Sequence, residues 1–324
     1  MPRALITCHH LQRHFDELRP RYEALGVVPI LPQIDGQHLD AETMREVIAG
    51  VDAVIAGDDQ IDATVLEIGK ATGLKAVIKW GIGTDSVDKG RAAELGIPVY
   101  NTPGTFANEV ADLACSLLLN VVRKTHLMHN SIKEGGWLKV QGRSLAGMVA
   151  GIIGLGSIGR AIARRAVGFG MKPLGCDVRA VAPEILAQHE LTQIGLDQLL
   201  AASDAVFLAC ELTQENRHLL NAAAFRQMKH GVYIVNVSRG PLIDEMALCA
   251  ALECGKVAGA GLDVFEVEPL PRESCLRRFE SCVFSTHNGS NTAEAVARVN
   301  EMTTDILFHV LGLQPIGFTR NRVA

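Results

Sequence analysis

The sequence has few aromatic residues, no strongly basic segment and no long apolar run. Aromatic residues make up 5% of the chain, and 31 Lys and Arg residues face 36 Asp and Glu residues, for a net charge of -5. This mild acidity argues against nucleic acid as the main ligand. Apolar runs stay below the roughly 18 residues of a membrane span, and no signal-peptide pattern opens the chain. We therefore expect a cytoplasmic protein without a membrane or nucleic-acid partner.

The eight cysteines lack the spacing of a metal or redox site. None belongs to a C-x-x-C pair, and several lie within apolar runs. Cysteines in such positions are typical of small buried side chains in a reducing compartment. We expect them to be thiols, and we predict no metal ligands.

The chain does contain a glycine-rich segment, GIIGLGSIGR, in which Gly154, Gly156 and Gly159 have the spacing G-x-G-x-x-G. An apolar run precedes it and a helical pattern follows. Gly154 would turn the strand into the helix, Gly156 would let the backbone approach a pyrophosphate, and Gly159 would allow close packing. The helix N-terminus, at Ser157 and Ile158, would offer N–H groups to the phosphates.

A second strand follows that helix and ends at Asp177. An acid roughly 20 residues beyond the glycines is typical of a residue that binds the ribose hydroxyls of the adenosine. A carboxylate there would repel a 2′-phosphate, so the pattern predicts NAD rather than NADP. A glycine-rich turn without a ligand is the alternative. The order of strand, glycines, helix, strand and acid favours the dinucleotide.

Apolar strands alternate with helical patterns through most of the chain, which predicts parallel sheets covered by helices on both faces. We expect an α/β fold with a doubly wound parallel-sheet nucleotide-binding domain at residues 102–290. A second, flavodoxin-like α/β substrate domain would be discontinuous, with residues 1–101 and 291–324. Single helices are expected at 11–25 and at 106–121, the latter with a broad apolar face.

Polar residues follow three strands of the larger predicted domain. Arg239 follows the strand at 232–237, Asp263 ends the strand at 258–263, and His287 follows the strand at 282–285. Ligands of open parallel sheets bind beyond the carboxyl ends of the strands, so these side chains should gather where the dinucleotide lies. Further cofactor contacts are expected from the same edge, at Cys210, Val237, Ser238 and Gly289.

Together the motifs resemble the D-isomer-specific 2-hydroxyacid dehydrogenases, and most closely the D-3-phosphoglycerate dehydrogenase group. The likeness covers nearly the whole chain. It rests on WGIGTDSVD at 80–88, NTPGT at 101–105, the glycine fingerprint, NVSRG at 236–240, LDVF at 262–265 with Glu268-Pro269, and His287. It implies an enzyme that transfers a hydride between NAD and a small D-2-hydroxy acid or 2-keto acid.

The resemblance also implies a role for each catalytic residue. His287 would exchange the proton of the alcohol or ketone oxygen, which suits a side chain whose ordinary pKa lies near neutrality. Glu268 would orient the imidazole and favour its protonated form. Glu266 has the same chemistry but not the family's offset from Asp263, so we expect it to face solvent. Arg239 would bind the substrate carboxylate and polarise the carbonyl.

Two further roles come from the resemblance. The backbone N–H groups of Gly81, Ile82 and Gly83 would hold the other side of the substrate carboxylate, as an anion-binding nest. Asp263 would contact the carboxamide of the nicotinamide.

The substrate end of the site departs from the family pattern. Phosphoglycerate-using members usually carry Arg-Ser after the third strand, where this chain has Asp58 and Asp59. Two carboxylates would repel a phosphate and accept hydrogen bonds from hydroxyl groups. This favours hydroxypyruvate or a sugar-acid-like keto acid over a phosphorylated one. Lys79, His9 and His10 are the residues that could supply opposing positive charge.

A second hypothesis is an NAD-sensing binding protein of the same fold, similar to the C-terminal-binding-protein corepressors. Those proteins bind peptides in a cleft of the substrate domain. The sequence shows no basic tract or segment typical of a disordered tail, which favours the enzyme. The apolar face of the helix at 106–121 further predicts a homodimer.

Overall fold

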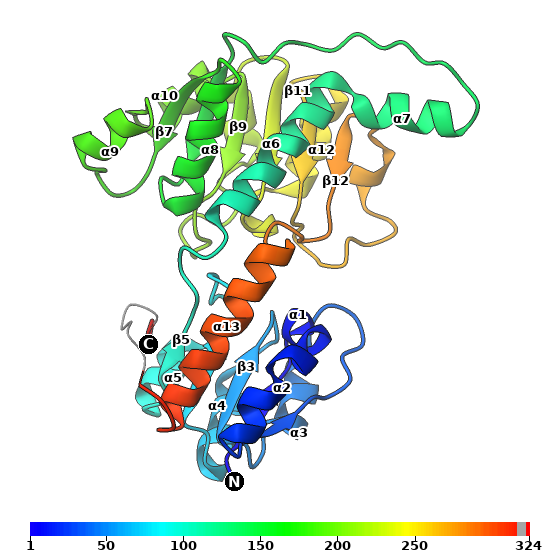
Figure 1. Ribbon diagram of the computed structural model, residues 1–324. Helices are drawn as coiled ribbons and strands as arrows, with labels where there is room; N and C mark the ends of the chain where they lie inside the picture. Colours follow the sequence, from blue (N-terminus) through cyan, green and yellow to red (C-terminus); the bar gives the residue numbers. More distant parts are fainter. Residues whose placement is uncertain (316–321) are drawn as a thin grey trace. The chain divides into compact units, whose positions relative to one another are not determined.

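The computed structural model describes residues 1–315 and 322–324 and contains two compact units (Figure 1). One unit consists of residues 1–105 and 292–324, and the other of residues 106–291. The sequence places the two boundaries at 101/102 and 290/291.

The smaller unit is a five-stranded parallel sheet in the order β2-β1-β3-β4-β5. Its strands are β1 Arg3–Ile6, β2 Val28–Ile30, β3 Ala53–Ala56, β4 Ala76–Lys79 and β5 Val99–Tyr100. Its helices are α1 His9–Arg13, α2 Phe15–Ala24, α3 Ala41–Val47, α4 Ala63–Thr72, α5 Lys89–Glu94 and α13 Ala293–Val310. The single helix expected at 11–25 is two helices, because the backbone leaves the helical region at His14.

The larger unit is a seven-stranded parallel sheet in the order β12-β11-β10-β9-β6-β7-β8. Its strands are β6 Val149–Ile153, β7 Lys172–Cys176, β8 Thr192–Gln193, β9 Ala205–Leu208, β10 Val232–Asn236, β11 Val257–Leu262 and β12 Cys282–Phe284. Its helices are α6 Ala107–Arg123, α7 Thr125–Lys133, α8 Ser157–Gly168, α9 Pro183–Gln188, α10 Leu196–Ala202, α11 Ala222–Gln227 and α12 Glu245–Glu253, with 3-10 turns η1 Gly240–Leu242 and η2 Cys275–Arg278. Both sheets confirm the predicted α/β class with two parallel sheets.

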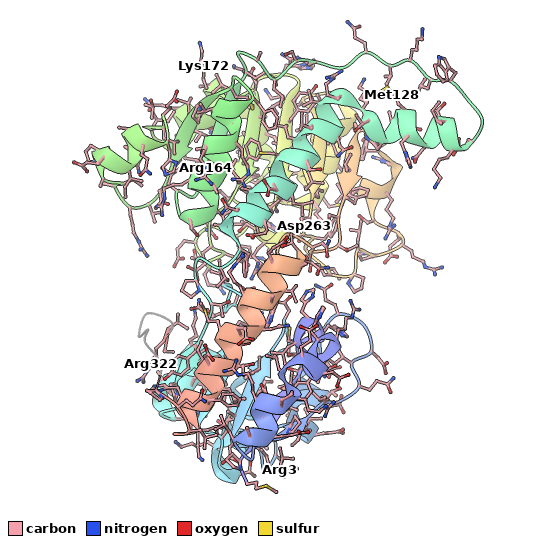
Figure 2. All side chains as sticks on the ribbon, viewed as in Figure 1. Arg3, Met128, Arg164, Lys172, Asp263 and Arg322 are labelled. Atoms are coloured by element: carbon pink, nitrogen blue, oxygen red, sulfur yellow. A yellow bond between two sulfur atoms is a disulfide. The ribbon has the colours of Figure 1, made fainter. Side chains whose placement is uncertain are left out.

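The carboxyl ends of neighbouring strands in the larger sheet are in register. The register pairs Ile153 with Cys176 and Leu208, Leu208 with Asn236, Asn236 with Leu262, and Leu262 with Phe284. The residues after each strand are therefore delivered to a single edge. Figure 2 shows Asp263 at this edge, whereas Lys172, the first residue of β7, lies at the opposite one.

Glycines in β11 bring α6 close to the sheet. A Cβ on Gly261 would lie 2.7 Å from Cβ of Leu117, and one on Gly259 would lie 2.5 Å from Cγ1 of Val121. Leu117 and Leu118 are buried in the unit, with 3% and 1% exposure. The apolar face of this helix thus packs on its own sheet beside α8, and does not by itself indicate a second subunit (Figure 1).

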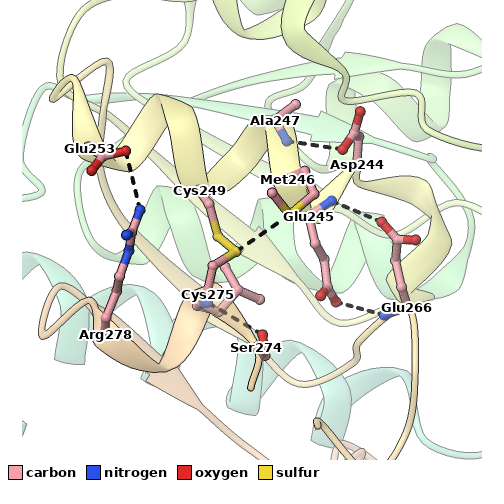
Figure 3. Close-up of a disulfide and its surroundings, with 11 residues drawn as sticks. Asp244, Glu245, Met246, Ala247, Cys249, Glu253, Glu266, Ser274, Cys275 and Arg278 are labelled. Carbon is pink, nitrogen blue, oxygen red and sulfur yellow. Dashed lines mark hydrogen bonds and ion pairs between the residues drawn. A yellow bond between two sulfur atoms is a disulfide. The ribbon is translucent and has the colours of Figure 1, made fainter. Parts of the chain in front are cut away.

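The structure corrects the expectation of eight thiols. Cys249 in α12 and Cys275 in η2 form a disulfide (Figure 3), whereas the other six cysteines are thiols. Their separation of 26 residues gives no sequence signal, because the pairing depends on how η2 packs on α12. Among the described residues, no helix is both long and apolar enough to cross a membrane.

Candidate active site

The three glycines of the fingerprint have separate steric roles. Gly154 has a left-handed φ of 97°, and a Cβ there would lie 2.5 Å from the backbone nitrogen of Cys210. A Cβ on Gly159 would lie 1.9 Å from the carbonyl oxygen of Gly154. Gly156 differs, since a Cβ there would meet no atom of the described chain within 4 Å. Two glycines therefore let β6, β9 and α8 pack, and the third leaves the approach to the helix N-terminus open.

The N-terminus of α8 fits the pyrophosphate of a dinucleotide. Gly156 occupies the N-cap, and no side chain caps the N–H groups of the first turn, which begins with Ser157 and Ile158. Such N–H groups and the positive end of the helix dipole bind phosphates. Asp177 lies beside this loop at the end of β7, and its Oδ2 accepts a hydrogen bond of 2.7 Å from the N–H of Leu155. The fingerprint and the acid are thus adjacent, as the dinucleotide pattern requires.

The segments that follow β9 and β10 contact each other. The hydroxyl of Ser238 donates to the carbonyl of Cys210, which connects the segments after β9 and β10. Burial raises the pKa of the Cys210 thiol to about 11, so it is neutral near pH 7. Val237 is buried beside Ser238. These residues provide an uncharged wall next to the fingerprint.

Asp263 holds the turn that carries His287. Its side chain is 2% exposed, and its carboxylate accepts hydrogen bonds from the N–H groups of Asn288, at 2.8 Å, and Gly289, at 3.0 Å. Its carbonyl accepts the N–H of His287 at 2.7 Å. From the sequence we expected only a cofactor contact for Asp263 and missed this structural role.

His287 and Glu268, which we expect from the sequence to act as an acid–base pair, are hydrogen-bonded to each other. Nδ1 of His287 lies 2.8 Å from Oε2 of Glu268, and Oε1 of the same carboxylate accepts the N–H of Phe265 at 2.9 Å. Because a carboxylate accepts hydrogen bonds, Nδ1 carries a proton in this pair, and we expect Nε2 to be the nitrogen that exchanges a proton with a substrate. His287 also has a φ of 51°, a left-handed conformation that is uncommon outside glycine and is found at functional sites.

Arg239 follows β10 at the same edge. Its backbone is extended, and Asn236 holds its carbonyl through a hydrogen bond of 2.9 Å from Nδ2. The guanidinium donates from Nη1 to the carbonyl of Ser238 at 2.8 Å. Because Asn236, Leu262 and Phe284 are in register, Arg239, Asp263 and His287 follow the ends of three adjacent strands.

In the smaller unit, the turn at residues 81–83 is anchored by the segment after β5. Thr102 donates its N–H to the carbonyl of Gly81 at 2.9 Å, and Asn101 donates from Nδ2 to the carbonyl of Ile82 at 2.8 Å. The N–H of Gly81 donates to Oγ1 of Thr102 at 3.2 Å, so it is not available to an anion in this arrangement. In the part of the chain that the structure describes, the N–H groups of Ile82 and Gly83 have no such acceptor. The expected nest is therefore reduced to two donors.

The two aspartates that we expected to face the substrate have different surroundings in the structure. Asp59 is fully buried, and its carboxylate accepts hydrogen bonds from Thr7 Oγ1 and from the N–H groups of Leu39 and Gly57. The expectation that it meets substrate hydroxyls is wrong, because these donors occupy it. Asp58 instead pairs with the buried Nζ of Lys79 at 2.8 Å.

The two neighbouring histidines make contacts within the smaller unit. His10 stacks on Trp80 with ring centroids 4.7 Å apart, and burial, followed by the nearby Arg13, lowers its pKa. Nε2 of His9 lies 2.9 Å from the carbonyl of Gly36. Lys79 lies beside the 81–83 turn, since a Cβ on Gly81 would lie 3.7 Å from its Nζ.

Comparisons with known proteins agree with this geometry. The family model described as D-isomer specific 2-hydroxyacid dehydrogenase, NAD binding domain, matches residues 115–289. The chain is 38% identical over 287 residues to a hydroxypyruvate reductase of Thermotoga maritima, covering 87% of this chain and 92% of that protein. This chain belongs to the D-isomer-specific 2-hydroxyacid dehydrogenase family. It is accordingly an NAD-dependent oxidoreductase of 2-hydroxy acids or 2-keto acids.

Two other similar proteins are named for different activities. The chain is 39% identical over 236 residues to a D-3-phosphoglycerate dehydrogenase of Sus scrofa, covering 72% of this chain but 44% of that protein. Its fold matches the structure of D-lactate dehydrogenase from Escherichia coli with a TM-score of 0.82 and 30% identity, over 100% of both chains.

The pair of His287 and Glu268 predicts a large loss of turnover when the imidazole is removed. We choose His287→Asn, because asparagine tolerates the left-handed backbone at this position. The rate of keto-acid reduction should fall by roughly 10²–10⁴-fold, with NADH affinity nearly unchanged in a fluorescence titration. His230→Ala is the matched control, since His230 is exposed and precedes β10 at the other edge of the sheet. Near-normal turnover of His287→Asn would show that another group exchanges the proton.

Asp177 predicts a preference for NADH over NADPH. The charge can be removed while an acceptor for the Leu155 N–H is kept, by Asp177→Asn. This variant should narrow the ratio of kcat/KM for NADH to that for NADPH, because the repulsion of a 2′-phosphate is lost. Equal efficiency of the unmodified protein with both cofactors would contradict the assignment.

Proposed function

We propose that this enzyme reduces a short, unphosphorylated 2-keto acid, with hydroxypyruvate as the preferred substrate, to the D-2-hydroxy acid. The observation that carries this choice is the ion pair between Lys79 and Asp58 beside the 81–83 turn. The cation in that region already has a carboxylate partner. A dianionic phosphate would have to compete with Asp58 for it, at a cost in a partly desolvated environment.

Each protein group then has a defined task. When bound, NADH supplies the hydride. His287 delivers a proton from Nε2 to the carbonyl oxygen while Glu268 balances the charge of the imidazolium. Arg239 binds the substrate carboxylate and stabilises negative charge on the reacting oxygen. In the smaller unit, the N–H groups of Ile82 and Gly83 bind a carboxylate oxygen.

The similarity to other family members supports the same choice. The relative named as a hydroxypyruvate reductase aligns over nearly its whole length, whereas the one named as a D-3-phosphoglycerate dehydrogenase is covered for less than half. The chain also lacks the Arg-Ser pair of phosphate-using members, and in its place Asp58 pairs with Lys79.

The proposal predicts the outcome of a competition between hydroxypyruvate and 3-phosphohydroxypyruvate at equal concentration. Hydroxypyruvate should be consumed faster, as followed by product analysis. Asp58→Asn should shift the ratio towards the phosphorylated compound, because Lys79 then lacks its counter-ion. Asp62→Asn serves as the control, since Asp62 caps α4 and pairs with Arg45 instead. Faster use of the phosphorylated compound by the unmodified enzyme would refute the substrate assignment.

We further propose that the enzyme is a homodimer in which the α7 region contacts the second copy. No residue of α7 is buried, and Ile132, Trp137 and Leu138 in and after this helix are 53%, 79% and 46% exposed. Figure 1 shows α7 projecting from its own unit, with the following segment returning to β6. Apolar side chains exposed together in this way are typical of a protein interface.

The dimer can be tested by sedimentation velocity at micromolar concentration. Trp137→Ser should shift the protein towards monomer, whereas Phe169→Ser, which changes another exposed aromatic residue of the same unit, should not. A monomeric wild-type protein at this concentration would contradict the proposal.

We also propose the cytoplasm as the location of the enzyme. The buried Cys8, Cys115 and Cys282 are thiols, in keeping with a reducing compartment. Disulfides are rare in such a compartment, where thiol reductants would act on the Cys249–Cys275 bond.

A further inference from the structure

The segment at residues 263–275 carries Glu268, and it is attached to α12 at Glu266 and at Cys275 (Figure 3). The attachment points on α12 are Glu245 and Cys249. Residues four apart in a helix lie on the same face, so both point to the segment.

The first attachment precedes Glu268. The N–H of Glu245 donates to Oε1 of Glu266 at 2.9 Å, and the N–H of Glu266 donates to Oε1 of Glu245 at 2.7 Å. The prediction that Glu266 faces solvent is therefore wrong, because its carboxylate completes this reciprocal pair. Nε2 of His218 lies 3.4 Å from its other oxygen. Burial, and then the carboxylates of Glu266 and Glu268, raise the pKa of Glu245.

The second attachment follows Glu268. The disulfide joins Cys275, at the start of η2, to Cys249, one turn along α12 from Glu245. Cys249 is 3% exposed and belongs to the core of the unit. The C-terminal end of the segment is therefore bonded to a fixed point of the core.

A third contact fixes the backbone next to the carboxylate. A Cβ on Gly240 would lie 1.8 Å from the carbonyl carbon of Phe265 and 2.4 Å from the nitrogen of Glu266. The segment thus packs directly on the residue after Arg239. The N–H of Phe265, which donates to Glu268, belongs to this fixed stretch.

We propose that Glu266 and the Cys249–Cys275 disulfide are positioning groups that hold the Glu268 carboxylate against Nδ1 of His287. This inference rests on the proposed acid–base role of that pair. A hydrogen bond of 2.8 Å requires the carboxylate to be well aligned, and small displacements of catalytic groups lower rates strongly. Loosening either attachment should weaken the interaction by which the Glu268 carboxylate stabilises the positive charge of the imidazolium. Neither change would remove a group that reacts with the substrate.

The main test compares Glu266→Ala with Glu266→Gln. The alanine removes the acceptor for the Glu245 N–H, whereas glutamine keeps an amide oxygen there. Glu266→Ala should lower kcat roughly 10-fold to 100-fold, with little change in KM for NADH. The rate of reduction should also fall off at a lower pH than in wild type, because a less well-balanced imidazolium loses its proton more easily. Glu266→Gln should restore most of both properties.

A double-mutant cycle separates positioning from a general structural effect. Glu268→Gln should shift the pH profile in the same direction and further than Glu266→Ala. If Glu266 acts through Glu268, adding Glu266→Ala to Glu268→Gln should have little additional effect. An undiminished effect of Glu266→Ala in the Glu268→Gln background would overturn the proposal, as would an unshifted pH profile in Glu266→Ala alone.

The disulfide is tested independently, which keeps the proposal open to refutation if Glu266→Ala fails to fold. Dithiothreitol would transfer two electrons and two protons to the bond, giving two thiols and its own cyclic disulfide. Reduction should lower kcat and shift the pH profile as Glu266→Ala does, and it should leave Cys275→Ser unaffected. An identical response of Cys275→Ser would show that reduction acts elsewhere, and an unchanged wild-type profile after complete reduction would exclude the disulfide as a positioning group.

The matched control is Glu253→Ala. Glu253 belongs to the same helix and pairs with Arg278 of η2 at 3.2 Å, but both side chains are more than half exposed. Such a pair contributes little to stability, so kcat and the pH profile should stay as in wild type. Failure of His287→Asn to lose activity would instead refute the acid–base role itself, a result distinct from failure of the positioning variants.

Discussion

The geometry of the sheet edge that carries Arg239, Asp263 and His287 depends on the hydrogen bonds of the Asp263 carboxylate. A carboxylate with 2% exposure is costly to bury unless donors satisfy it, and the N–H groups of Asn288 and Gly289 do so. Together with the bond from the His287 N–H to its carbonyl, they tie the turn after β12 to the end of β11. The left-handed backbone of His287 is held in this way by a neighbouring strand.

Glu268 reaches the same imidazole from the segment that begins at Asp263. The end of β11 therefore positions both members of the His287–Glu268 pair. Asp263 contacts the turn of His287 directly, and the residues that follow Asp263 lead to Glu268. The contact of Gly240 with Phe265 extends this arrangement to β10, because Gly240 follows Arg239. The three strand ends followed by Arg239, Asp263 and His287 are thus fixed to one another by backbone contacts.

The sequence was sufficient to predict the parallel sheets, the glycine fingerprint and which residues follow each strand. Gly154 and Gly159 were predictable because their spacing reflects local strand-to-helix packing, and His287 with Glu268 because a family pattern marks them. The short helix α7 was missed, and none of its residues is buried in the unit.

Other features depend on contacts between distant parts of the chain. Asp58 and Asp59 are adjacent, yet one pairs with Lys79 and the other is enclosed by Thr7 and Leu39. Adjacent residues in an irregular segment carry no periodicity that would show which one points inward. The same holds for Glu266 and for the pairing of Cys249 with Cys275, because neither partner lies near the other in sequence.

The attachments of the segment at 263–275 also determine where its length can change. From Asp263 to Glu268 the backbone is held by the strand end, by Gly240 and by Glu245, so an added residue would displace the carboxylate. At Arg272 and Glu273 the chain is exposed, whereas the carbonyls of Leu270 and Pro271 accept hydrogen bonds from Arg277. Insertions are tolerated where exposed backbone makes few contacts. Variation in loop length among related proteins, or a grafted peptide, should therefore be accommodated in this short stretch, beyond the last residue that touches the imidazole.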